Sequence, residues 1–440
     1  MMEKLFRLQA NNTTVKVEII AGITTFLATM YIIVVNPSII SQAGLEFSGV
    51  LTATVLVSAF SSIAMGIYAN NPIVLAPGMG LNAFFAYSVV MGMGVDWRVA
   101  LGAVFWSGIV FLILSILNIR TLIVKAIPKQ LRYAIAAGIG LFIAFIGFVN
   151  ADFIVDNPAT LVTFSQLNPI TITFLAGLAI TAILVVKRVR AALIFGIVLT
   201  TLMAIPIGRL WGNAAELNFG VPTLVTWKGL FAAPDFSVLF ALDLTGSLSL
   251  ALWPVIFAFL FTDMFDSLST FIGVAEAANL VDQEGEPRHI KESLIVDGFS
   301  TTISGLFGTS PGTAYIESAT GIEEGGRTGL SAVVAGLLFL PFIFLSPLLS
   351  VIPDIATAPA LILVGVFMMK PVLKINWMHF DDAIPAFLGM LLIPLTYSIT
   401  QGIIWGFLSW TVIKLAVGKK HEVTPTLLVI DAFAILALIV

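Results

Sequence analysis

Charged residues are scarce in this chain. Only 10% of its 440 residues are Asp, Glu, Lys or Arg, and 59% are hydrophobic, whereas roughly a quarter of the residues in a soluble domain are charged. Cysteine is absent, which excludes disulfides, thiol nucleophiles and cysteine metal sites. The histidines, His289, His379 and His421, lack the spacing of a metal site. We expect no cofactor, no metal and no nucleic-acid partner.

Long apolar runs take the place of charge. Most of them approach the roughly 20 residues that cross a bilayer as a helix, so the sequence predicts a polytopic membrane protein. Residues 1–16 precede the first run, carry no cleavable signal pattern and are expected to form a cytoplasmic tail. The fourteen predicted segments are 17–35, 49–69, 73–93, 99–117, 133–149, 170–186, 191–207, 250–272, 294–307, 313–324, 329–345, 358–369, 383–399 and 402–417.

The placement of Lys and Arg predicts the orientation, because positively charged loops stay cytoplasmic. With the N-terminus inside, all of these residues except Arg98, Arg209 and Lys228 fall inside. The count requires 313–324 to cross, although a helix of that length spans only about 18 Å; non-helical chain must complete this crossing. The last apolar stretch, 427–440, is predicted to be an interfacial or packing helix, since another crossing would end the chain outside.

Two segments contain Pro-Gly inside the membrane. Segment three reads NPIVLAPGMGLNAFFAYSVV and segment ten reads FGTSPGTAYIESATGI; Asn82 and Glu317 follow the two Pro-Gly pairs by five and six residues. A lone Pro-Gly is more typical of a helix kink. These two hold the same place in each group of seven segments, and because seven is odd the second group runs in the opposite sense. This pattern predicts an inverted repeat and a binding site at the interrupted segments.

The residues before each Pro-Gly are expected to be extended. Backbone groups without partners inside a bilayer cost several kcal/mol each, so NPIVLA and FGTS are predicted to meet as short antiparallel strands. The half-helices that follow would direct free N–H groups and a positive dipole end toward a cavity. The predicted fold is an all-α polytopic membrane protein with two inverted seven-segment repeats and short antiparallel strands in segments three and ten.

Acidic residues inside the apolar runs are the main functional candidates, because intramembrane carboxylates are costly. Asp263 and Asp266 share one helix face with Ser267 and Thr270, which indicates an aqueous cavity; a polar seam between helices is the structural alternative. Glu317 is expected to start a half-helix, where the dipole favours its ionised form and burial opposes it. This competition suits a group that changes its protonation during a transport cycle.

Other acidic residues have structural interpretations. Glu323 and Glu324 are expected in a solvated cytoplasmic turn, and Asp381 and Asp382 at the start of segment thirteen, where acids in the first turn stabilise a helix. Asp297 is placed at the start of segment nine, as a cap or with a role left open.

Three classes of protein compete. An intramembrane aspartyl protease needs aspartates on facing helices and a Gly-x-Gly-Asp motif, whereas Asp263 and Asp266 lie on one helix and that motif does not occur. An anion transporter would hold its charge with N–H dipoles and cationic side chains, and has little use for three buried acids. A proton-coupled importer of a neutral polar solute needs such acids.

Three stretches, NPIVLAPGMGLNAFFAY, FLFTDMFDSLSTFIGVAEAANL and GLFGTSPGTAYIESATGIEEGGRTGL, resemble the azaguanine-resistance-type guanine/hypoxanthine/adenine permeases, a branch of nucleobase:cation symporter family 2. The similarity runs over essentially the whole chain. It implies a core domain of segments one to four and eight to eleven, and a gate domain of the other segments. The implied core parts are 17–119 and 248–348, and the gate parts are 120–247 and 349–440.

The resemblance also implies a site where the short strands meet segment eight. The family's functional residues carry over to Asn82, Asp263 and Glu317, with Asp266 as a supporting acid. The uracil/xanthine branch has Glu followed four residues later by His, where this chain has Asp263 and Ser267. The shorter acid leaves more room, in agreement with a purine.

The predicted function is import of purine nucleobases, guanine or hypoxanthine and also adenine, by proton symport through alternating access. The alternatives are a uracil/xanthine-type permease and an inorganic-anion transporter of the same fold; Na⁺ coupling and a homodimer are left open. The protein is expected to be a transporter and not an enzyme, in the plasma or inner membrane with both termini cytoplasmic.

The residues expected at the substrate have two roles. Carboxylates would accept hydrogen bonds from the base, while Asn82 and main-chain groups donate back, and Phe84 or Phe265 would offer a stacking face. The predicted substrate-binding residues are Asp263, Glu317, Asn82, Tyr315, Ile316 and Thr313, and the predicted proton-coupling residues are Glu317, Asp263 and Asp266.

Overall fold

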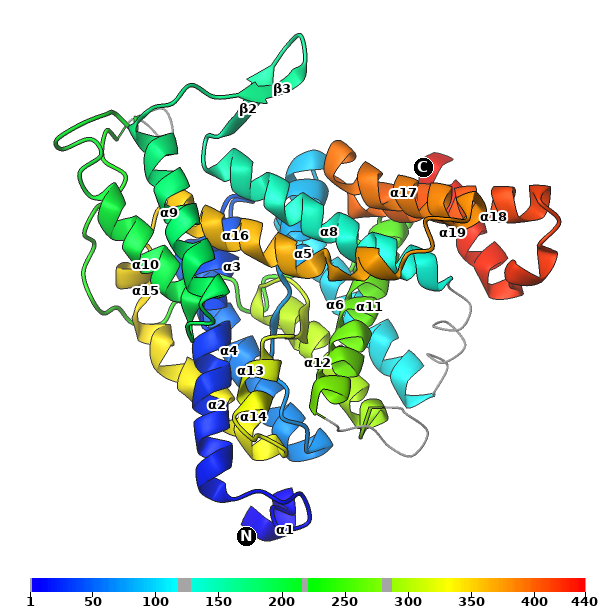
Figure 1. The fold of residues 1–440 in the computed structure, drawn as a ribbon, viewed down its shortest axis with the longest axis horizontal. Helices are drawn as coiled ribbons and strands as arrows, with labels where there is room; N and C mark the ends of the chain where they lie inside the picture. Colours follow the sequence, from blue (N-terminus) through cyan, green and yellow to red (C-terminus); the bar gives the residue numbers. More distant parts are fainter. Residues whose placement is uncertain (1, 118–127, 216–220, 279–286, 440) are drawn as a thin grey trace.

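The computed structural model describes residues 2–117, 128–215, 221–278 and 287–439, and it is mostly helical (Figure 1). The helices of the first half are α1 Met2–Phe6, α2 Val15–Thr29, α3 Ile32–Ser41, α4 Phe47–Ala64, α5 Met79–Ala83, α6 Trp97–Ile116, α8 Lys129–Asn150, α9 Pro169–Val186 and α10 Ala192–Ala204. Those of the second half are α11 Trp253–Ala278, α12 Ile290–Phe307, α13 Ser318–Glu323, α14 Gly329–Phe339, α15 Ser346–Leu349, α16 Asp354–Met368, α17 Phe380–Thr396, α18 Ile399–Ala416 and α19 Pro425–Ile439. The strands are β1 Leu75–Pro77, β2 Ile154–Asn157, β3 Leu161–Phe164 and β4 Gly312–Ala314.

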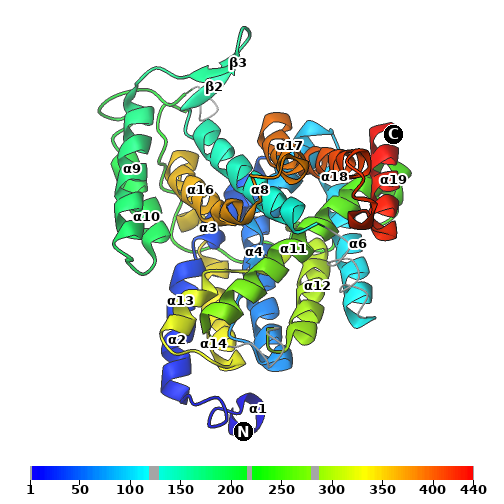
Figure 2. The ribbon, with the colours of Figure 1, turned by 45° about the vertical axis from the view of Figure 1, so that its right-hand side comes forward.

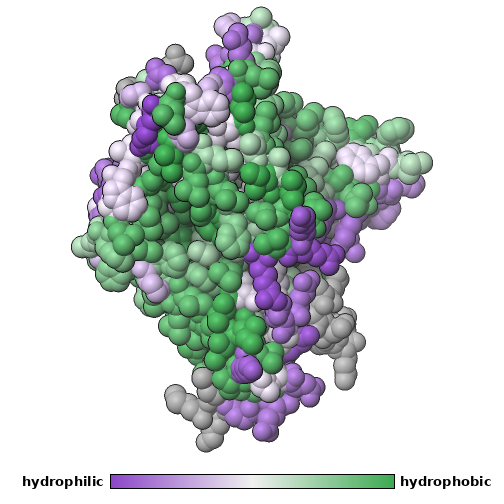
Figure 3. Space-filling view, turned by 60° about the vertical axis from the view of Figure 1, so that its left-hand side comes forward, coloured by the Kyte–Doolittle hydropathy of each residue, from purple (hydrophilic) through white to green (hydrophobic). Residues whose placement is uncertain are grey.

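The helices are those of a multi-pass membrane protein. Within the described ranges, eight spans are long and apolar enough to cross a bilayer, and three shorter apolar helical stretches accompany them. Apolar side chains cover most of the face shown in Figure 3, and hydrophilic ones gather at the top and bottom of that view and in a band on its right-hand side. A surface of this kind is stable in lipid rather than in water.

The first predicted segment is interrupted. Instead of one helix over 17–35, α2 ends at Thr29 and α3 begins at Ile32. The Thr29 hydroxyl donates to the carbonyl oxygens of Thr25 (2.9 Å) and Phe26 (3.2 Å), a back-bonding pattern that bends helices. Tyr31 lies at this break and is 1% exposed.

The two Pro-Gly segments meet at β1 and β4. These strands are antiparallel, with Leu75 opposite Ala314, Ala76 opposite Thr313 and Pro77 opposite Gly312. The ladder is extended by hydrogen bonds from Gly78 N to Pro311 O (2.9 Å) and from Tyr315 N to Val74 O (3.0 Å). Polar backbone deep inside the protein is thereby paired, as burial requires.

The second strand begins after its proline, whereas the sequence placed the extended stretch before it, at FGTS. Phe307 still belongs to α12, and Gly308 ends that helix with φ +95°. The N–H groups of Gly308 and Thr309 both bond to Ser304 O, at 3.0 Å. A left-handed glycine cap of this kind uses the residues that were expected to be extended.

A second pair of strands was not predicted. β2 and β3 form an antiparallel hairpin between α8 and α9, in register from Ile154 opposite Phe164 to Asn157 opposite Leu161. It projects from the helices at the top of Figure 1. The hairpin is short, and all four residues of β3 are exposed, so a search for membrane-length apolar runs does not detect it.

Helix packing falls into two sets, whose members are separated in the sequence (Figures 1 and 2). In one set α14 packs on α2 and α4, and α12 packs on α4 and α6. In the other set α8 packs on α16 and α17, α17 on α18, and α9 on α10 and α16. α11 contacts members of both sets.

Several structural predictions for the chain ends and loops are confirmed. Asp381 and Asp382 lie in the first turn of α17. α19 forms a helix against α18 and α11, as expected for a packing helix. Glu323 is exposed at the end of α13, and Glu324 pairs with Arg190. The predicted boundary between 119 and 120 lies outside the described residues.

Candidate functional site

The β1–β4 pair is joined to its surroundings by serine side chains. Ser62 Oγ of α4 accepts from Leu75 N (3.1 Å) and donates to Leu75 O (3.0 Å). Ser267 Oγ of α11 accepts from Ala314 N at 3.0 Å. The outer edges of the two strands are therefore satisfied by neighbouring helices, which fixes α11 against β4.

Asp263 lies on the same face of α11, fully buried. One of its carboxylate oxygens, Oδ2, accepts a hydrogen bond from Thr301 of α12, and Thr301 Oγ1 also lies 3.1 Å from Gly312 O. The other oxygen, Oδ1, is buried without a hydrogen-bond partner among the described residues. A buried acceptor without a partner is costly and is suited to a ligand that brings a donor.

Asp266 follows one turn later and is partly exposed. Thr313 Oγ1 of β4 is 3.4 Å from Asp266 Oδ2 and 2.7 Å from Ser267 Oγ. Asp266 interacts electrostatically with both Asp263 and Glu317. The structure thus brings together three of the acids that the sequence singled out.

Glu317 is the residue directly before α13, where its side chain makes no capping hydrogen bond, and it is partly exposed. Tyr31, from the break between α2 and α3, donates its hydroxyl to Glu317 Oε1 at 2.8 Å. The Tyr31 ring also packs against Tyr315, with centroids 6.4 Å apart, and Tyr315 donates to Pro77 O at 2.5 Å. Glu317 is therefore held by the first segment as well as by its own.

Asp297 is not at the start of its helix, so the interpretation as a cap is wrong. α12 begins at Ile290 with His289 as its N-cap, which places Asp297 two turns into the helix, because segment nine extends further than its apolar run. Asp297 is fully buried and interacts electrostatically with Asp263 and Asp266. The Ser267 hydroxyl interacts with this carboxylate, but neither carboxylate oxygen has a hydrogen bond of normal geometry in the described part of the chain.

Asn82 lies at the β1 side of the site. It is fully buried in α5, which begins directly after Gly78 and contacts α11. Its Nδ2 is 3.8 Å from Met79 Sδ, and its Oδ1 has no partner among the described residues. Asn82 thus retains hydrogen-bonding capacity, and the structure records no contact between its side chain and the acids.

The aromatic candidates differ from the expectation. Phe84 is fully buried and packs edge-on against Phe259, with centroids 4.9 Å apart, so its faces belong to the protein core. Phe265 is 7% exposed, and its ring centroid lies 4.5 Å from that of Phe261. The guanidinium carbon of Arg132 lies 5.8 Å from the Phe265 ring centroid. Neither ring presents an open face to a ligand.

Ile316 stands out beside these buried groups, because 46% of its surface is exposed although Tyr315 on one side is 5% exposed. Together with partly exposed Asp266 and Glu317, it marks the accessible side of the site. Asp263 and Asp297 lie on the closed side. The acids are thus graded from solvent-accessible to fully buried.

Sequence reasoning missed several polar partners of the site. Tyr31 donates to Glu317, and Thr301 donates to Asp263. Asn36 is fully buried and donates to Thr54 (2.7 Å) and Thr309 (2.8 Å), which fixes the turn before Pro311. Asn36 was detectable as an amide directly after the apolar run of segment one, which ends at residue 35. Tyr31 and Thr301 carried no comparable signal.

Known proteins resemble this chain over its whole length. A model of a permease family, Xan_ur_permease, matches residues 16–404. Adenine permease AdeP of Escherichia coli is 42% identical, covering 100% of this chain and 96% of AdeP. Guanine/hypoxanthine permease PbuO of Bacillus subtilis is also 42% identical, covering 98% of each chain.

A solved structure shares the fold. The transmembrane domain of the cyanobacterial bicarbonate transporter BicA superposes with a TM-score of 0.64, covering 88% of this chain and 97% of that one, at 16% identity. At this level of identity the likeness concerns the fold alone.

Proposed function

Because the chain belongs to the nucleobase:cation symporter family of permeases, we propose that it imports purine nucleobases by proton symport. The family consists of transporters, so the protein is a transporter and not an enzyme. Its relatives named for adenine and for guanine/hypoxanthine support a purine substrate. We assign the transport to the cell membrane, with both termini in the cytoplasm.

The observation that carries this proposal is the convergence of carboxylates beside the β1–β4 pair. The edge of a purine presents N–H donors next to nitrogen and oxygen acceptors. Asp263 Oδ1 is an unpaired acceptor, and Glu317 Oε1 is held toward the site by Tyr31. In the proposal these two acids accept from the base, while Asn82 and the main chain at Thr313, Tyr315 and Ile316 complete the contacts.

Proton coupling is proposed to use the same acids. Asp266 and Glu317 are partly accessible, and Asp263 and Asp297 are buried behind them. Close carboxylates cannot all remain ionised in a low dielectric, so at least one proton is held by this group. Protonation from outside and release to the cytoplasm would then accompany the movement of the neutral base. The hydroxyls of Tyr31 and Thr301 favour the ionised form of the acids that they contact.

The proposed architecture is fourteen segments in two inverted repeats, with 17–119 and 248–348 as the core and 120–247 and 349–440 as the gate. The antiparallel pairing of β1 with β4, one from each Pro-Gly segment, supports the repeat. The two sets of packed helices support the division, because α2, α4, α12 and α14 form one set and α8, α9, α16 and α17 the other. Alternating access would come from one set moving against the other around the strands.

Uptake of labelled hypoxanthine into cells or proteoliposomes tests the proposal. Guanine and adenine should compete, uracil and bicarbonate should not, and a protonophore should abolish accumulation. Glu317→Gln and Asp263→Asn should each lower the uptake rate by about 10- to 100-fold, as expected for loss of a hydrogen bond to a buried charged group. Glu323→Gln is the matched control, because Glu323 is exposed at the other end of α13. Uptake that survives both site substitutions would refute the proposed roles.

A further inference from the structure

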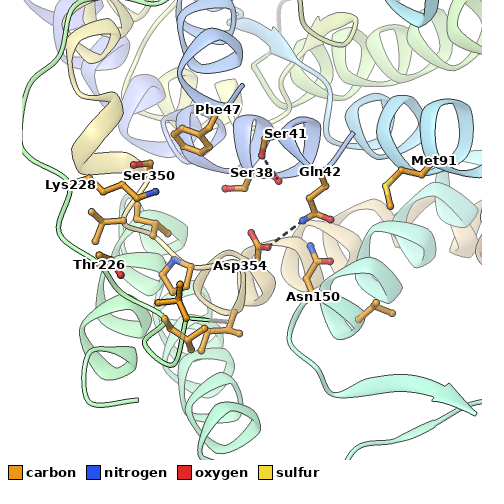
Figure 4. Close-up of a pocket in the computed structure, with 17 residues that line it drawn as sticks. Ser38, Ser41, Gln42, Phe47, Met91, Asn150, Thr226, Lys228, Ser350 and Asp354 are labelled. Carbon is orange, nitrogen blue, oxygen red and sulfur yellow. Dashed lines mark hydrogen bonds between the residues drawn. The ribbon is translucent and has the colours of Figure 1, made fainter. Parts of the chain in front are cut away.

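A cavity lies apart from the β1–β4 pair and its acids. Its volume is about 800 Å³, within the range of roughly 300–1,000 Å³ that is typical of small-molecule sites. Asp263, Asp266 and Glu317 do not line it. Its walls come from α3, α8 and α16 and from the chain around Lys228 (Figure 4). Because α3 packs on α4 of the first set, and Phe47 of α4 also lines the cavity, whereas α8 and α16 belong to the second set, the cavity lies between the two sets of helices.

A chain of hydrogen bonds crosses this cavity. Gln42, the residue directly after α3, donates through Nε2 to Asp354 Oδ2 of α16 at 3.4 Å, and its Oε1 accepts from Tyr87 at 3.0 Å. Asn150 of α8 donates to the Tyr87 hydroxyl at 3.3 Å. The chain thus begins on α16 and ends on α8, and it passes through Gln42 and Tyr87 between them. Both ends of the Gln42 amide have a partner.

The hydrogen bond between Gln42 and Asp354 is the weakest in this chain of bonds. At 3.4 Å it is long for an N–H···O bond, whose usual range is about 2.7–3.2 Å. Asp354 is exposed to the cavity although protein surrounds it on most sides. Figure 4 shows Gln42, Asp354 and Asn150 directed toward one another. A ligand with adjacent donor and acceptor groups can replace this bond, giving N–H to Asp354 and accepting from Gln42.

The cavity also has apolar walls. Phe47, half-buried at the start of α4, and Val149, Ile352 and Ile355 line it. A few convergent polar groups among apolar side chains are the usual composition of a site for a small organic molecule. The polar side of the cavity offers one carboxylate, Asp354, and one ammonium group, Lys228, beside amide and hydroxyl groups. A set of donors and acceptors with balanced charge suits a neutral solute.

We propose that this cavity is a second binding site for the transported solute, a planar neutral heterocycle with adjacent hydrogen-bond donors and acceptors. Gln42 and Asp354 bind its edge, and Asn150 closes the polar side. The inference rests on the proposed function, since it takes the same class of substrate. The site captures the solute before it reaches the acids beside β1 and β4. Because it is open to water, it binds more weakly than the buried site.

Asp354 also has a simpler role. It lies in the first turn of α16, where an acid stabilises the helix start. If that were its whole role, Asp354→Asn would lower the melting temperature without changing ligand binding, and Gln42→Ala would change neither. The two residues are therefore tested together.

Equilibrium binding of labelled hypoxanthine to the purified full-length protein in lipid nanodiscs tests the proposal. The wild-type protein should show two classes of site. Gln42→Ala and Asp354→Asn should each lose the weaker class and retain the tighter one, and Glu317→Gln should do the reverse. In cells, Asp354→Asn should raise the KM of uptake about tenfold, the effect of one hydrogen bond to a charged group, and Gln42→Ala should raise it about fivefold, the effect of one neutral hydrogen bond. Both variants should leave the maximal rate within about twofold.

Ser350→Ala is the matched control. Ser350 lines the same cavity, but its hydroxyl donates to Pro347 O at 3.1 Å, so this variant should bind and transport like the wild type. A single class of site that Glu317→Gln abolishes, and that Gln42→Ala and Asp354→Asn leave unchanged, would overturn the second site while the proposed function stands. Absence of any nucleobase binding by the wild-type protein would overturn the proposed function itself.

Discussion

Replacing Tyr31 by phenylalanine isolates one interaction of the site. The substitution removes the hydroxyl that donates to Glu317 Oε1 at 2.8 Å and retains the ring that packs on Tyr315. Tyr31 is 1% exposed, so water cannot easily replace the lost donor. The fold should therefore persist while Glu317 loses its side-chain partner.

The magnitude follows from the kind of bond. A hydrogen bond to a charged group contributes about 1.5–3 kcal/mol, which corresponds to roughly tenfold to somewhat over a hundredfold in an equilibrium or rate constant. Tyr31→Phe should lower the kcat/KM of hypoxanthine uptake by this factor. Because the ionised carboxylate loses a donor, the pH at which the uptake rate is half-maximal should also move upward.

Initial uptake rates measured over a series of external pH values, at equal amounts of membrane protein, provide the assay. Tyr68→Phe is the control, since Tyr68 is 59% exposed in the π-helical turn after α4. A merely structural Tyr31 would lower the amount of folded protein and leave the pH profile in place. Wild-type rates together with an unshifted profile in Tyr31→Phe would refute the reasoning about Glu317.

Three further substitutions test packing at the site and charges elsewhere in the protein. A Cβ on Gly312 would collide with Ser300 Oγ, so Gly312→Ala should destabilise the protein by about 1–3 kcal/mol, and adding Ser300→Ala should recover part of the monodisperse yield in detergent. The Lys414 side chain is 1% exposed and pairs with three carboxylates, so Lys414→Met should lower the free energy of unfolding by about 3–5 kcal/mol. Lys419 is 41% exposed and has one carboxylate partner, so Lys419→Met should lower the melting temperature much less. Hydrogen bonds lower the pKa of Asp243 below its ordinary 3.8, and the largest effect comes from the backbone N–H of Gly246. The stability that Asp243 contributes is therefore present above pH 3.8 and is lost as the pH falls through the pKa of the folded protein. Asp243→Asn should remove this acid sensitivity from thermal melts.

The family and the membrane class were readable from the sequence, and both are confirmed. Apolar run length reports local transfer into lipid, so most predicted segments correspond to observed helices. Helical periodicity likewise placed Asp263, Asp266 and Ser267 on one face, and all three meet neighbouring groups of the site. These features depend only on residues close together in the chain.

Helix ends were less predictable, because they depend on capping and on neighbours. Because Gly308 caps α12, the second strand begins after Pro311 and not before it, where the sequence had predicted it. Asp297 was predicted at a helix start and lies in the interior of α12, because the polar residues before it belong to the same helix. A search for apolar runs detects the part of a helix that contacts lipid and does not detect the polar turns at its ends.

The sequence by itself determined that this is a membrane transporter chain with acids in its apolar segments and two Pro-Gly interruptions. Only the tertiary structure decided which groups hold those acids. Tyr31 and Glu317 are 286 residues apart in the chain, and Thr301 and Asp263 are 38 apart. Such partners leave no periodic signal, because a hydrogen bond between distant segments is set by how whole helices pack, and one polar residue in an apolar run does not indicate which neighbour it will meet.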